Sequence, residues 1–349
     1  MTEALARIVG LLKQAHEHQA SDLHISVGSP PVLRIHGVLR SLGEEAVTGE
    51  ASRAMAEALL TPEQLANFET NGEVDFSYEL EGWARYRINA FRQRGKASIA
   101  IRTIPTVIPT LQQLQLPDVI GQLAGKHQGL VLVTGPTGSG KSSTLAAIID
   151  HINRTQKRHI VTLEDPIEFL HAHASSVVDQ REVGSDTRSF SKGLRAALRQ
   201  DPDVILVGEM RDLETISAAV TAAETGHLVL ATLHTTDAPQ TIDRIIDAFP
   251  AHQQGQVRMQ LAAVLLAVVS QRLLPRPGRQ GRACATEILI NTPAVANLIR
   301  TEKVHQIKSV MQTGRAQGMH TLDASLRELM AQGLVEAAAA KPYLSEGGG

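Results

Sequence analysis

From about residue 110 onward, short apolar runs alternate with segments of helical periodicity. The apolar runs are residues 130–134, 159–163, 204–207 and 227–232. A continuous apolar run indicates a strand that is buried on both faces, and helices between such strands favour a mainly parallel sheet. We therefore predict an α/β domain in this part of the chain. After residue 250, the pattern predicts helices over 252–272, 293–300, 304–312 and 321–333.

The first hundred residues follow a different pattern, which predicts a smaller α+β domain. Apolar positions recur at helical spacing over residues 3–19 and 49–69, whereas residues 75–80 alternate as a strand does. Two further strands, over 84–92 and 97–102, are predicted to form a hairpin through a glycine-containing turn.

A proline-containing segment separates the two patterns. Residues 104–109 hold two prolines, which interrupt regular structure, so we interpret this segment as a linker. We expect an N-terminal domain over residues 1–103, a linker over 104–112 and a second domain over 113–349. The C-terminal helices of the second domain are expected to begin at about residue 290.

One stretch of the second domain carries a complete phosphate-binding signature. It follows an apolar strand, precedes a helical segment and matches the pattern G-x-x-x-x-G-K-[ST]. Its glycines allow successive backbone N–H groups to point at phosphate oxygens, and the following helix adds its positive end. Lys141 is expected to contact the β- and γ-phosphates, and Ser142 to offer its hydroxyl to Mg²⁺. The residues expected to bind the nucleotide are Gly135, Pro136, Thr137, Gly138, Ser139, Gly140, Lys141, Ser142 and Ser143.

Two later strands end in acidic residues. In an open α/β sheet, ligands bind at the carboxyl ends of the strands. Glu164 directly follows residues 159–163, so it could hold Mg²⁺ or orient the attacking water; the alternative is an acidic turn that ends the strand. Glu209 follows residues 204–207 and Gly208, as the acid of a Walker B element does. We assign Glu209 to Mg²⁺ binding and water positioning.

Two histidines flank the strand at 227–232. His234 lies beyond its carboxyl end, where a neutral imidazole could sense the γ-phosphate or hydrogen-bond a catalytic acid. His227 lies at the other end, about 20 Å away at ~3.3 Å per residue, so the two histidines cannot share a metal ion. An ordinary structural role is the alternative for each of them.

The predicted hairpin of the first domain carries a band of arginines. Tyr86, Ile88 and Ala90 share one face of the strand at 84–92, which leaves the polar positions on the other face. The arginines of the hairpin are Arg85, Arg87, Arg92, Arg94 and Arg102. An arginine from another domain or subunit can stabilise the transition-state charge of phosphoryl transfer. A solvated strand face is the alternative interpretation.

The composition limits the class of protein. The 349 residues carry a formal net charge of −2, which gives no general attraction to nucleic acid or to an anionic membrane. A single cysteine, Cys284, excludes an internal disulfide and fits a reducing compartment. The chain begins without a signal-peptide pattern, and its longest apolar run, residues 261–269, is far shorter than the ~20 residues that span a bilayer. We therefore expect a cytoplasmic protein. The basic segment 275–282 is interpreted as a solvated surface loop.

Together these motifs resemble the secretion ATPase superfamily, which drives type II secretion and type IV pili. The resemblance rests on four segments in a fixed order. They are Gly-Pro-Thr-Gly-Ser-Gly-Lys-Ser from Gly135, Glu-Asp-Pro-Ile-Glu from Glu164, Arg-Gln-Asp-Pro-Asp-Val-Ile-Leu-Val-Gly-Glu-Met-Arg-Asp from Arg199, and Gly-His-Leu-Val-Leu-Ala-Thr-Leu-His-Thr from Gly226. Within the superfamily, the chain is most similar to the pilus retraction (twitching motility) ATPases of the PilT family.

The resemblance implies a homohexameric ring in which each subunit has a PAS-like N-terminal domain and a RecA-like P-loop ATPase core. ATP and Mg²⁺ are then expected between the two domains. Glu164 is implied as the catalytic carboxylate and Glu209 as the Walker B acid. The residues implied as further contacts to the nucleotide are His227 and His234 of a His box, and Arg87 and Arg102 of the N-terminal domain. The implied partner is the pilus platform protein of the inner membrane, so membrane association would come only through partners.

Two features bear on the direction of such a motor. Assembly and secretion members carry paired C-x-x-C zinc motifs after the segment that corresponds to Ser270-Gln-Arg-Leu. This chain has only Cys284 there, and the absence of the paired motif favours retraction. The retraction family carries a C-terminal motif that residues 294–301 match in its core, although Ala296 and Thr301 replace a charged pair.

The favoured hypothesis is a hexameric ATPase motor that drives type IV pilus disassembly and retraction. The alternatives are a pilus assembly or type II secretion ATPase, an accessory nucleotide-binding paralogue with low turnover, and a nucleic-acid motor. The lack of a basic, aromatic-bearing groove disfavours nucleic acid as a partner.

Overall fold

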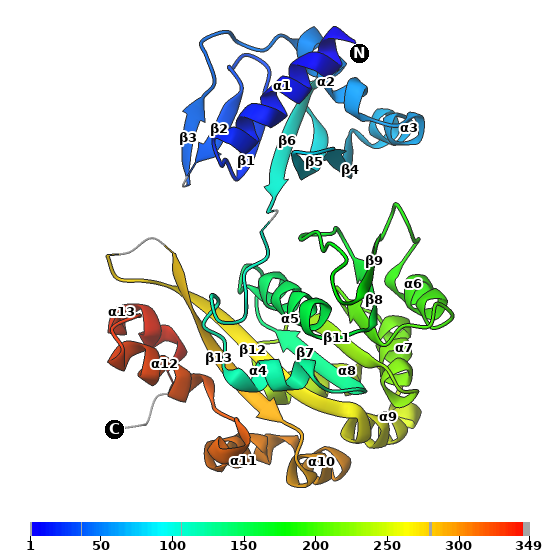
Figure 1. The fold of residues 1–349 in the computed structure, drawn as a ribbon, viewed down its shortest axis with the longest axis vertical. Helices are drawn as coiled ribbons and strands as arrows, with labels where there is room; N and C mark the ends of the chain where they lie inside the picture. The colour runs from blue at the N-terminus through cyan, green and yellow to red at the C-terminus, as the bar shows by residue number, and fades with distance from the viewer. Residues whose placement is uncertain (1, 36, 106, 279–280, 345–349) are drawn as a thin grey trace. The chain divides into compact units, whose positions relative to one another are not determined.

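The computed structural model describes residues 2–35, 37–105, 107–278 and 281–344, which form two compact units (Figure 1). Unit 1 comprises residues 1–107 with 168–170, and unit 2 comprises residues 108–167 with 171–349. Each unit has its own sheet and its own hydrophobic core. The chain is therefore mixed α/β, as its pattern predicts.

Unit 1 is a sheet that shares one core with its helices. The strand order is β3-β2-β1-β6-β5-β4, with antiparallel pairing throughout. The elements are α1 (Glu3–Glu17), β1 (Asp22–Ile25), β2 (Val32–Ile35), β3 (Val38–Ser41), α2 (Gly49–Leu59), α3 (Pro62–Asn71), β4 (Glu73–Leu80), β5 (Ala84–Gln93) and β6 (Lys96–Ile104). Tyr86, Ile88 and Ala90 are fully buried in that core, which confirms the predicted alternation of β5.

The single helix predicted over residues 49–69 is wrong, because the chain breaks between α2 and α3. Pro62 lacks a backbone N–H and occupies the first turn of α3, where that donor is not needed. Thr61 and Gln64 cap this helix reciprocally, with bonds of 3.3 Å from the Gln64 N–H and 2.9 Å from the Thr61 N–H. The capping pair, rather than the apolar spacing, sets the helix boundary.

Unit 2 is a sheet covered on both faces, with strand order β13-β12-β7-β11-β10-β8-β9. Among the described strands of this sheet, β12 and β13 pair antiparallel and all other neighbours pair parallel. The elements are α4 (Asp118–Ala124), β7 (Gly129–Thr134), α5 (Lys141–Thr155), β8 (His159–Glu164), β9 (Val177–Glu182), α6 (Phe190–Ala197), β10 (Val204–Val207), α7 (Leu213–Glu224), β11 (Leu228–Leu233), α8 (Ala238–Asp247), α9 (Ala251–Val264), β12 (Leu265–Pro275), β13 (Arg282–Ile290), α10 (Pro293–Arg300), α11 (Ile307–Thr313), α12 (Leu322–Ala331) and α13 (Ala337–Ala340).

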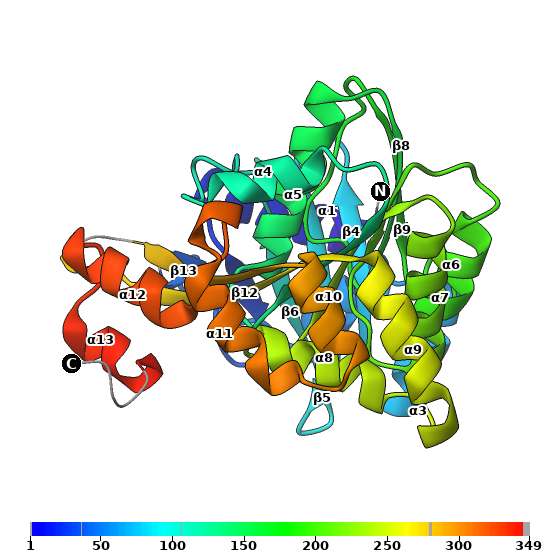
Figure 2. The same cartoon turned by 90° about the horizontal axis from the view of Figure 1, so that it is seen from below.

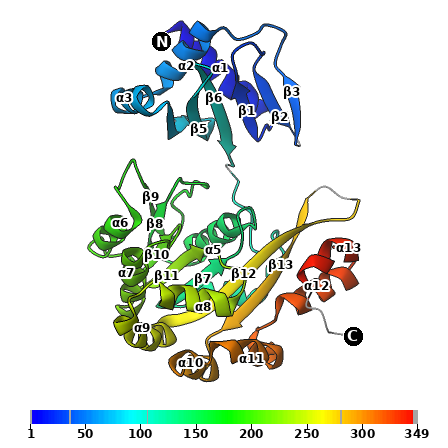
Figure 3. The ribbon, with the colours of Figure 1, turned by 180° about the vertical axis from the view of Figure 1, so that it is seen from behind.

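Two hydrophobic clusters fill the two faces of this sheet. Alternate residues of β7 divide between them: Leu130 and Leu132 pack with α7, α8 and α9, whereas Val131 and Val133 pack with α4 and α5. Helices α7, α8 and α9 are labelled around this sheet in Figure 3. Burial on both faces explains why these strands read as continuous apolar runs. Among the described residues, no helix has the length and apolar character needed to cross a bilayer.

The predicted helix over residues 252–272 is wrong in its second half. Helix α9 ends at Val264, and β12 follows at once, pairing with β7 and with β13. A buried strand and a buried helix have the same apolar character over so short a run, so periodicity cannot separate them. The chain thus adds an antiparallel hairpin to the edge of the parallel sheet.

The C-terminal helices continue beyond this hairpin (orange and red in Figure 2). Helices α12 and α13 pack against Leu274, Ala283 and Ala285 of β12 and β13. Glu287 of β13 is buried and accepts backbone N–H bonds from Ala238 at 3.0 Å and from Leu322 at 3.4 Å. A single carboxyl group therefore joins the first turns of α8 and α12 to the sheet.

Candidate nucleotide-binding site

The glycine-rich segment forms the turn between β7 and α5. Gly135 has φ 142°, and a Cβ atom there would lie 2.5 Å from the backbone oxygen of Gln271, so only glycine fits. Gly140, with φ 91°, is the N-cap of α5 and supplies no side-chain cap. The first N–H groups of a 15-residue helix therefore have no side-chain cap, which suits them to an anion.

Lys141 lies within the curl of this turn. Its Nζ donates to the backbone oxygens of Gly135 at 2.8 Å and Pro136 at 3.1 Å. The ammonium group is thus held in the loop that the phosphates are expected to enter. Of the remaining predicted phosphate-binding residues, Thr137 and Gly138 are exposed, Ser139 is buried, and Ser142 and Ser143 are partly exposed in the first turn of α5.

Residues of the β12–β13 hairpin support the turn, and the sequence analysis missed them. Gln271 is buried and donates from Nε2 to Thr144 Oγ1 at 2.8 Å and to Cys284 Sγ at 3.4 Å. Arg282 donates to the Gly138 oxygen at 3.3 Å, so the basic segment is not merely solvated. Burial raises the pKa of the Cys284 thiol to about 11, so it stays protonated and unreactive.

The predicted acids lie at the same edge of the sheet as the glycine-rich turn. Strands β7, β11, β10 and β8 are adjacent in that order and parallel, so their carboxyl ends meet there. Glu209 and His234 are in contact, with 2.9 Å between Oε1 and Nε2. Arg211 pairs with the same carboxylate oxygen of Glu209. The Glu209 side chain is only 18% exposed, so this contact holds it firmly.

Glu164 is the last residue of β8 and has partners on two strands. Its Oε1 accepts from Thr162 Oγ1 at 2.6 Å and from Gln180 Nε2 at 3.1 Å. Gln180 lies on β9, a strand that the sequence analysis did not predict. Because β9 is an edge strand with mixed polar and apolar positions, its pattern gives no clear signal.

The structure does not bring His227 to this edge. It precedes β11, and its backbone oxygen accepts from the N–H of Gly129 at the start of β7. Its Nδ1 lies 2.9 Å from the Ala222 oxygen and 3.3 Å from Thr225 Oγ1. Within unit 2, His227 therefore joins α7 to β11 at the end of the sheet opposite the glycine-rich turn.

Arg87 and Arg102 lie opposite each other on β5 and β6 of unit 1, and both are exposed. Like charges at directly opposed positions repel. Arg102 also donates to Asp22 at 3.1 Å.

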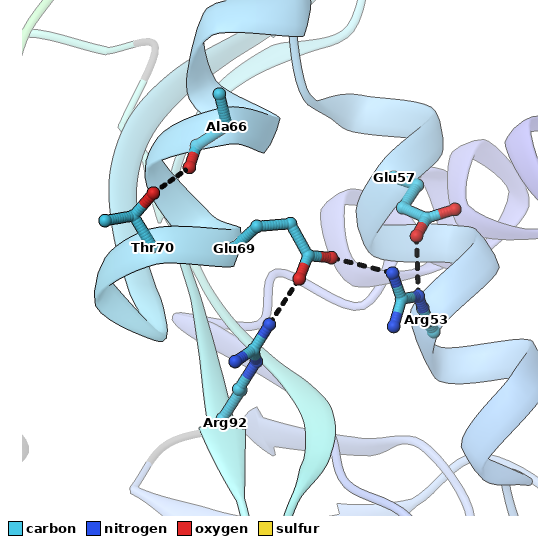
Figure 4. A network of polar contacts seen from close by, with 6 residues as sticks. All are labelled: Arg53, Glu57, Ala66, Glu69, Thr70 and Arg92. Atoms are coloured by element: carbon cyan, nitrogen blue, oxygen red, sulfur yellow. Dashed lines mark hydrogen bonds and ion pairs between the residues drawn. The ribbon is translucent and has the colours of Figure 1, made fainter.

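The other arginines of the hairpin have local roles. Arg85 lies 3.7 Å from Glu79, and Arg94 has φ 50° in the turn between β5 and β6. Arg92 bonds to Glu69, which also binds Arg53 (Figure 4). Arg92 thus ties β5 to α3 and α2.

The residues present fit a magnesium ion better than a metal held wholly by protein. Among the described residues, no group of three or more His, Cys, Asp or Glu side chains could hold a metal ion. Mg²⁺ typically takes one or two protein oxygens together with substrate phosphates and water. Ser142, in the first turn of α5, and Glu209, after β10, lie at the same edge of the sheet and carry the hydroxyl and carboxylate oxygens that such a site uses.

The loop after Glu164 contains a histidine that makes stability depend on pH. Burial lowers the pKa of His171 from 6.5 to about 4, and the charge of Asp150 opposes this only in part. Since the unfolded chain takes up a proton that the folded chain excludes, stability falls as the pH drops from 6.5 towards 4. We expect about 2 kcal/mol less stability at pH 5 than at pH 7 from this group. Urea unfolding at both pH values measures it, and an equal loss in His171→Gln would contradict the assignment.

Comparison with known proteins gives one consistent result. The family of type II/IV secretion system proteins matches residues 4–340. The chain is 50% identical over 328 residues to the type IV pilus retraction ATPase PilT of Pseudomonas aeruginosa, covering 94% of this chain and 95% of that one. It is 51% identical over 312 residues to a twitching motility protein of Neisseria gonorrhoeae, covering 89% and 83%. A crystal structure of the pilus retraction motor PilT with bound ADP matches with a TM-score of 0.90 at 47% identity, covering 96% of both chains.

Proposed function

Because this chain belongs to the family of type II/IV secretion system proteins, we propose that it is the ATPase motor that retracts a type IV pilus. The chain is an ATPase, and the work of its ATP hydrolysis is pilus disassembly, which produces twitching motility. One observation carries this proposal. A phosphate-binding turn and two carboxylates meet at one edge of a parallel sheet, in a chain similar to a retraction motor over almost its whole length.

The residues at that edge of the sheet have separate roles in ATP hydrolysis. The N–H groups of the glycine-rich turn and Lys141 hold the phosphates, and Glu164 orients the attacking water. Glu209 and Ser142 would hold Mg²⁺, which would supply positive charge to the phosphates when bound. His234, in contact with Glu209, couples this carboxylate to the end of β11.

The arginines of unit 1 complete the site. Arg87 and Arg102 reach the phosphates when the N-terminal domain of one subunit closes on a neighbour in a homohexameric ring. The direct opposition and exposure of these two arginines support this role, since both side chains can approach one anion. Repeated closures around the ring move the membrane platform protein of the pilus, so the motor works at the inner membrane from the cytoplasmic side through this partner.

A pilus count tests the direction of the motor. Cells that lack the protein should carry more surface pili and lose twitching, and complementation with Glu209→Gln should leave both defects in place. Complementation with the unaltered protein should restore both, which is the matched control. Bald cells would show an assembly motor instead, and unchanged pili and twitching would favour an accessory paralogue.

A further inference from the structure

The carboxyl group of Glu164 is held from the neighbouring strand. In the parallel pairing of β8 with β9, Thr162 lies beside Gln180 and Glu164 beside Glu182. Residues two apart on a strand share a face, so these four side chains stand on one side of the sheet. Thr162 is fully buried and Gln180 partly buried. The two hydrogen bonds to Glu164 therefore come from well-supported positions.

The orientation of the Gln180 amide follows from its other partner. The backbone N–H of His171 bonds to Gln180 Oε1 at 2.8 Å, and an N–H can only donate. The remaining amide atom is Nε2, which can only donate, and it bonds to Glu164 Oε1. Gln180 thus presents a proton donor to the carboxylate and an acceptor to the loop that follows it.

Glu182 fixes the same loop at a second point. It is buried, and its Oε2 accepts from the N–H of Ile167 at 3.0 Å. With Ile167 held by Glu182 and His171 held by Gln180, both flanks of the segment after Glu164 are tied to β9. Gln180 also bonds to the Glu164 carboxylate.

We propose that Gln180 is a positioning residue for ATP hydrolysis, which holds the Glu164 carboxylate in the orientation needed to align the attacking water. This inference rests on the proposed function, because it takes Glu164 as the group that aligns water. Two donors on one carboxylate oxygen fix the plane of the group. Gln180 acts through Glu164 and touches no reacting atom.

Two variants separate this role from a purely structural one. Gln180→Leu removes both bonds, whereas Gln180→Glu keeps an acceptor for the His171 N–H and places a second carboxylate against Glu164. We expect both variants to lower kcat by about 10- to 100-fold with little change in KM for ATP. If Gln180 merely anchored the loop, Gln180→Glu would keep the normal kcat, and that result would overturn the proposal.

A double-mutant cycle gives a second readout. In the Glu164→Gln background, Gln180→Leu should lower kcat no further, because the group on which it acts is already gone. A full additional loss would show that Gln180 acts elsewhere. If Glu164→Gln kept its normal activity, the proposed function of Glu164 would be wrong. If Glu164→Gln lost activity but the Gln180 variants kept theirs, only the inference about Gln180 would be wrong.

The chain offers a matched control for these variants. Gln260 of α9 donates to the carboxylate of Glu224 at 2.9 Å, which is another glutamine–carboxylate pair far along the chain from the site. Gln260→Leu should leave kcat and KM unchanged. Thermal unfolding and binding of a fluorescent ATP analogue confirm that each variant is folded before its turnover is compared.

Discussion

Glu164→Gln should lower the turnover of ATP by about 10²- to 10⁴-fold while nucleotide binding stays within a few-fold of normal. The amide keeps the size of the carboxylate and an oxygen that can accept from Thr162 and Gln180, so the site should keep its shape. It removes the negative charge that aligns and deprotonates water. Phosphate release measures the loss, and titration with a fluorescent ATP analogue measures binding.

The matched control for this change is Glu224→Gln. Glu224 is an exposed carboxylate at the last residue of α7, accepts from Gln260 Nε2 at 2.9 Å, and lies at the end of α7 that leads to His227, opposite the nucleotide edge. Its replacement should leave turnover normal. Should Glu164→Gln hydrolyse ATP at the normal rate, another group must align the water, and Glu209 would be the next candidate.

Lys141→Ala should abolish measurable turnover and weaken ATP binding by about 100-fold or more. Its Nζ is held inside the glycine-rich turn by two backbone oxygens, so the charge is already in place for the phosphates. Charge-assisted bonds to phosphate are among the strongest that a side chain makes, and alanine cannot replace any of them. The dissociation constant for ATP and the rate of phosphate release measure the two effects.

Lys157→Ala serves as the comparison for this variant. Lys157 is exposed and follows the other end of the same helix, α5. The Lys157→Ala substitution removes one positive charge at the negative end of the helix, so it tests whether a change in net charge alone weakens ATP binding. Normal binding in Lys157→Ala with lost binding in Lys141→Ala is the expected pair of results. Normal binding in both would contradict the assignment of the glycine-rich turn.

The sequence predicts the parts of the fold that have their own local signal. The apolar runs of β7, β8, β10 and β11 differ in pattern from the helical segments between them. The alternation of apolar and polar residues in β5 separates its buried face from its exposed face. The boundary within residues 252–272 has no such signal, because helix α9 and strand β12 are both covered by other elements. The second half of this segment is a strand because it pairs with β7, which lies more than a hundred residues earlier in the chain.

The residues of the candidate site also fall into those that the sequence could predict and those that it could not. The glycine-rich turn, Glu164, Glu209 and His234 follow predicted strands, so their common edge follows from parallel pairing. Gln180 and Gln271 could not be found, because each is a lone polar residue whose role depends on a neighbour distant in sequence. The position of His227 was foreseeable from strand geometry alone, and the structure keeps it away from that edge.

The order of strands along the sheet also means that the ribosome completes the glycine-rich turn well before it makes one of the residues that contact it. Strand β7 pairs with β11 on one side and with β12 on the other, and Gly135 packs against the backbone oxygen of Gln271. The ribosome makes Gln271 roughly 130 residues after the glycine-rich turn, a delay of about 7–26 s at about 5–20 residues per second. During that delay the nascent turn lacks its contact with Gln271, so the complete turn forms only after most of the chain has been translated.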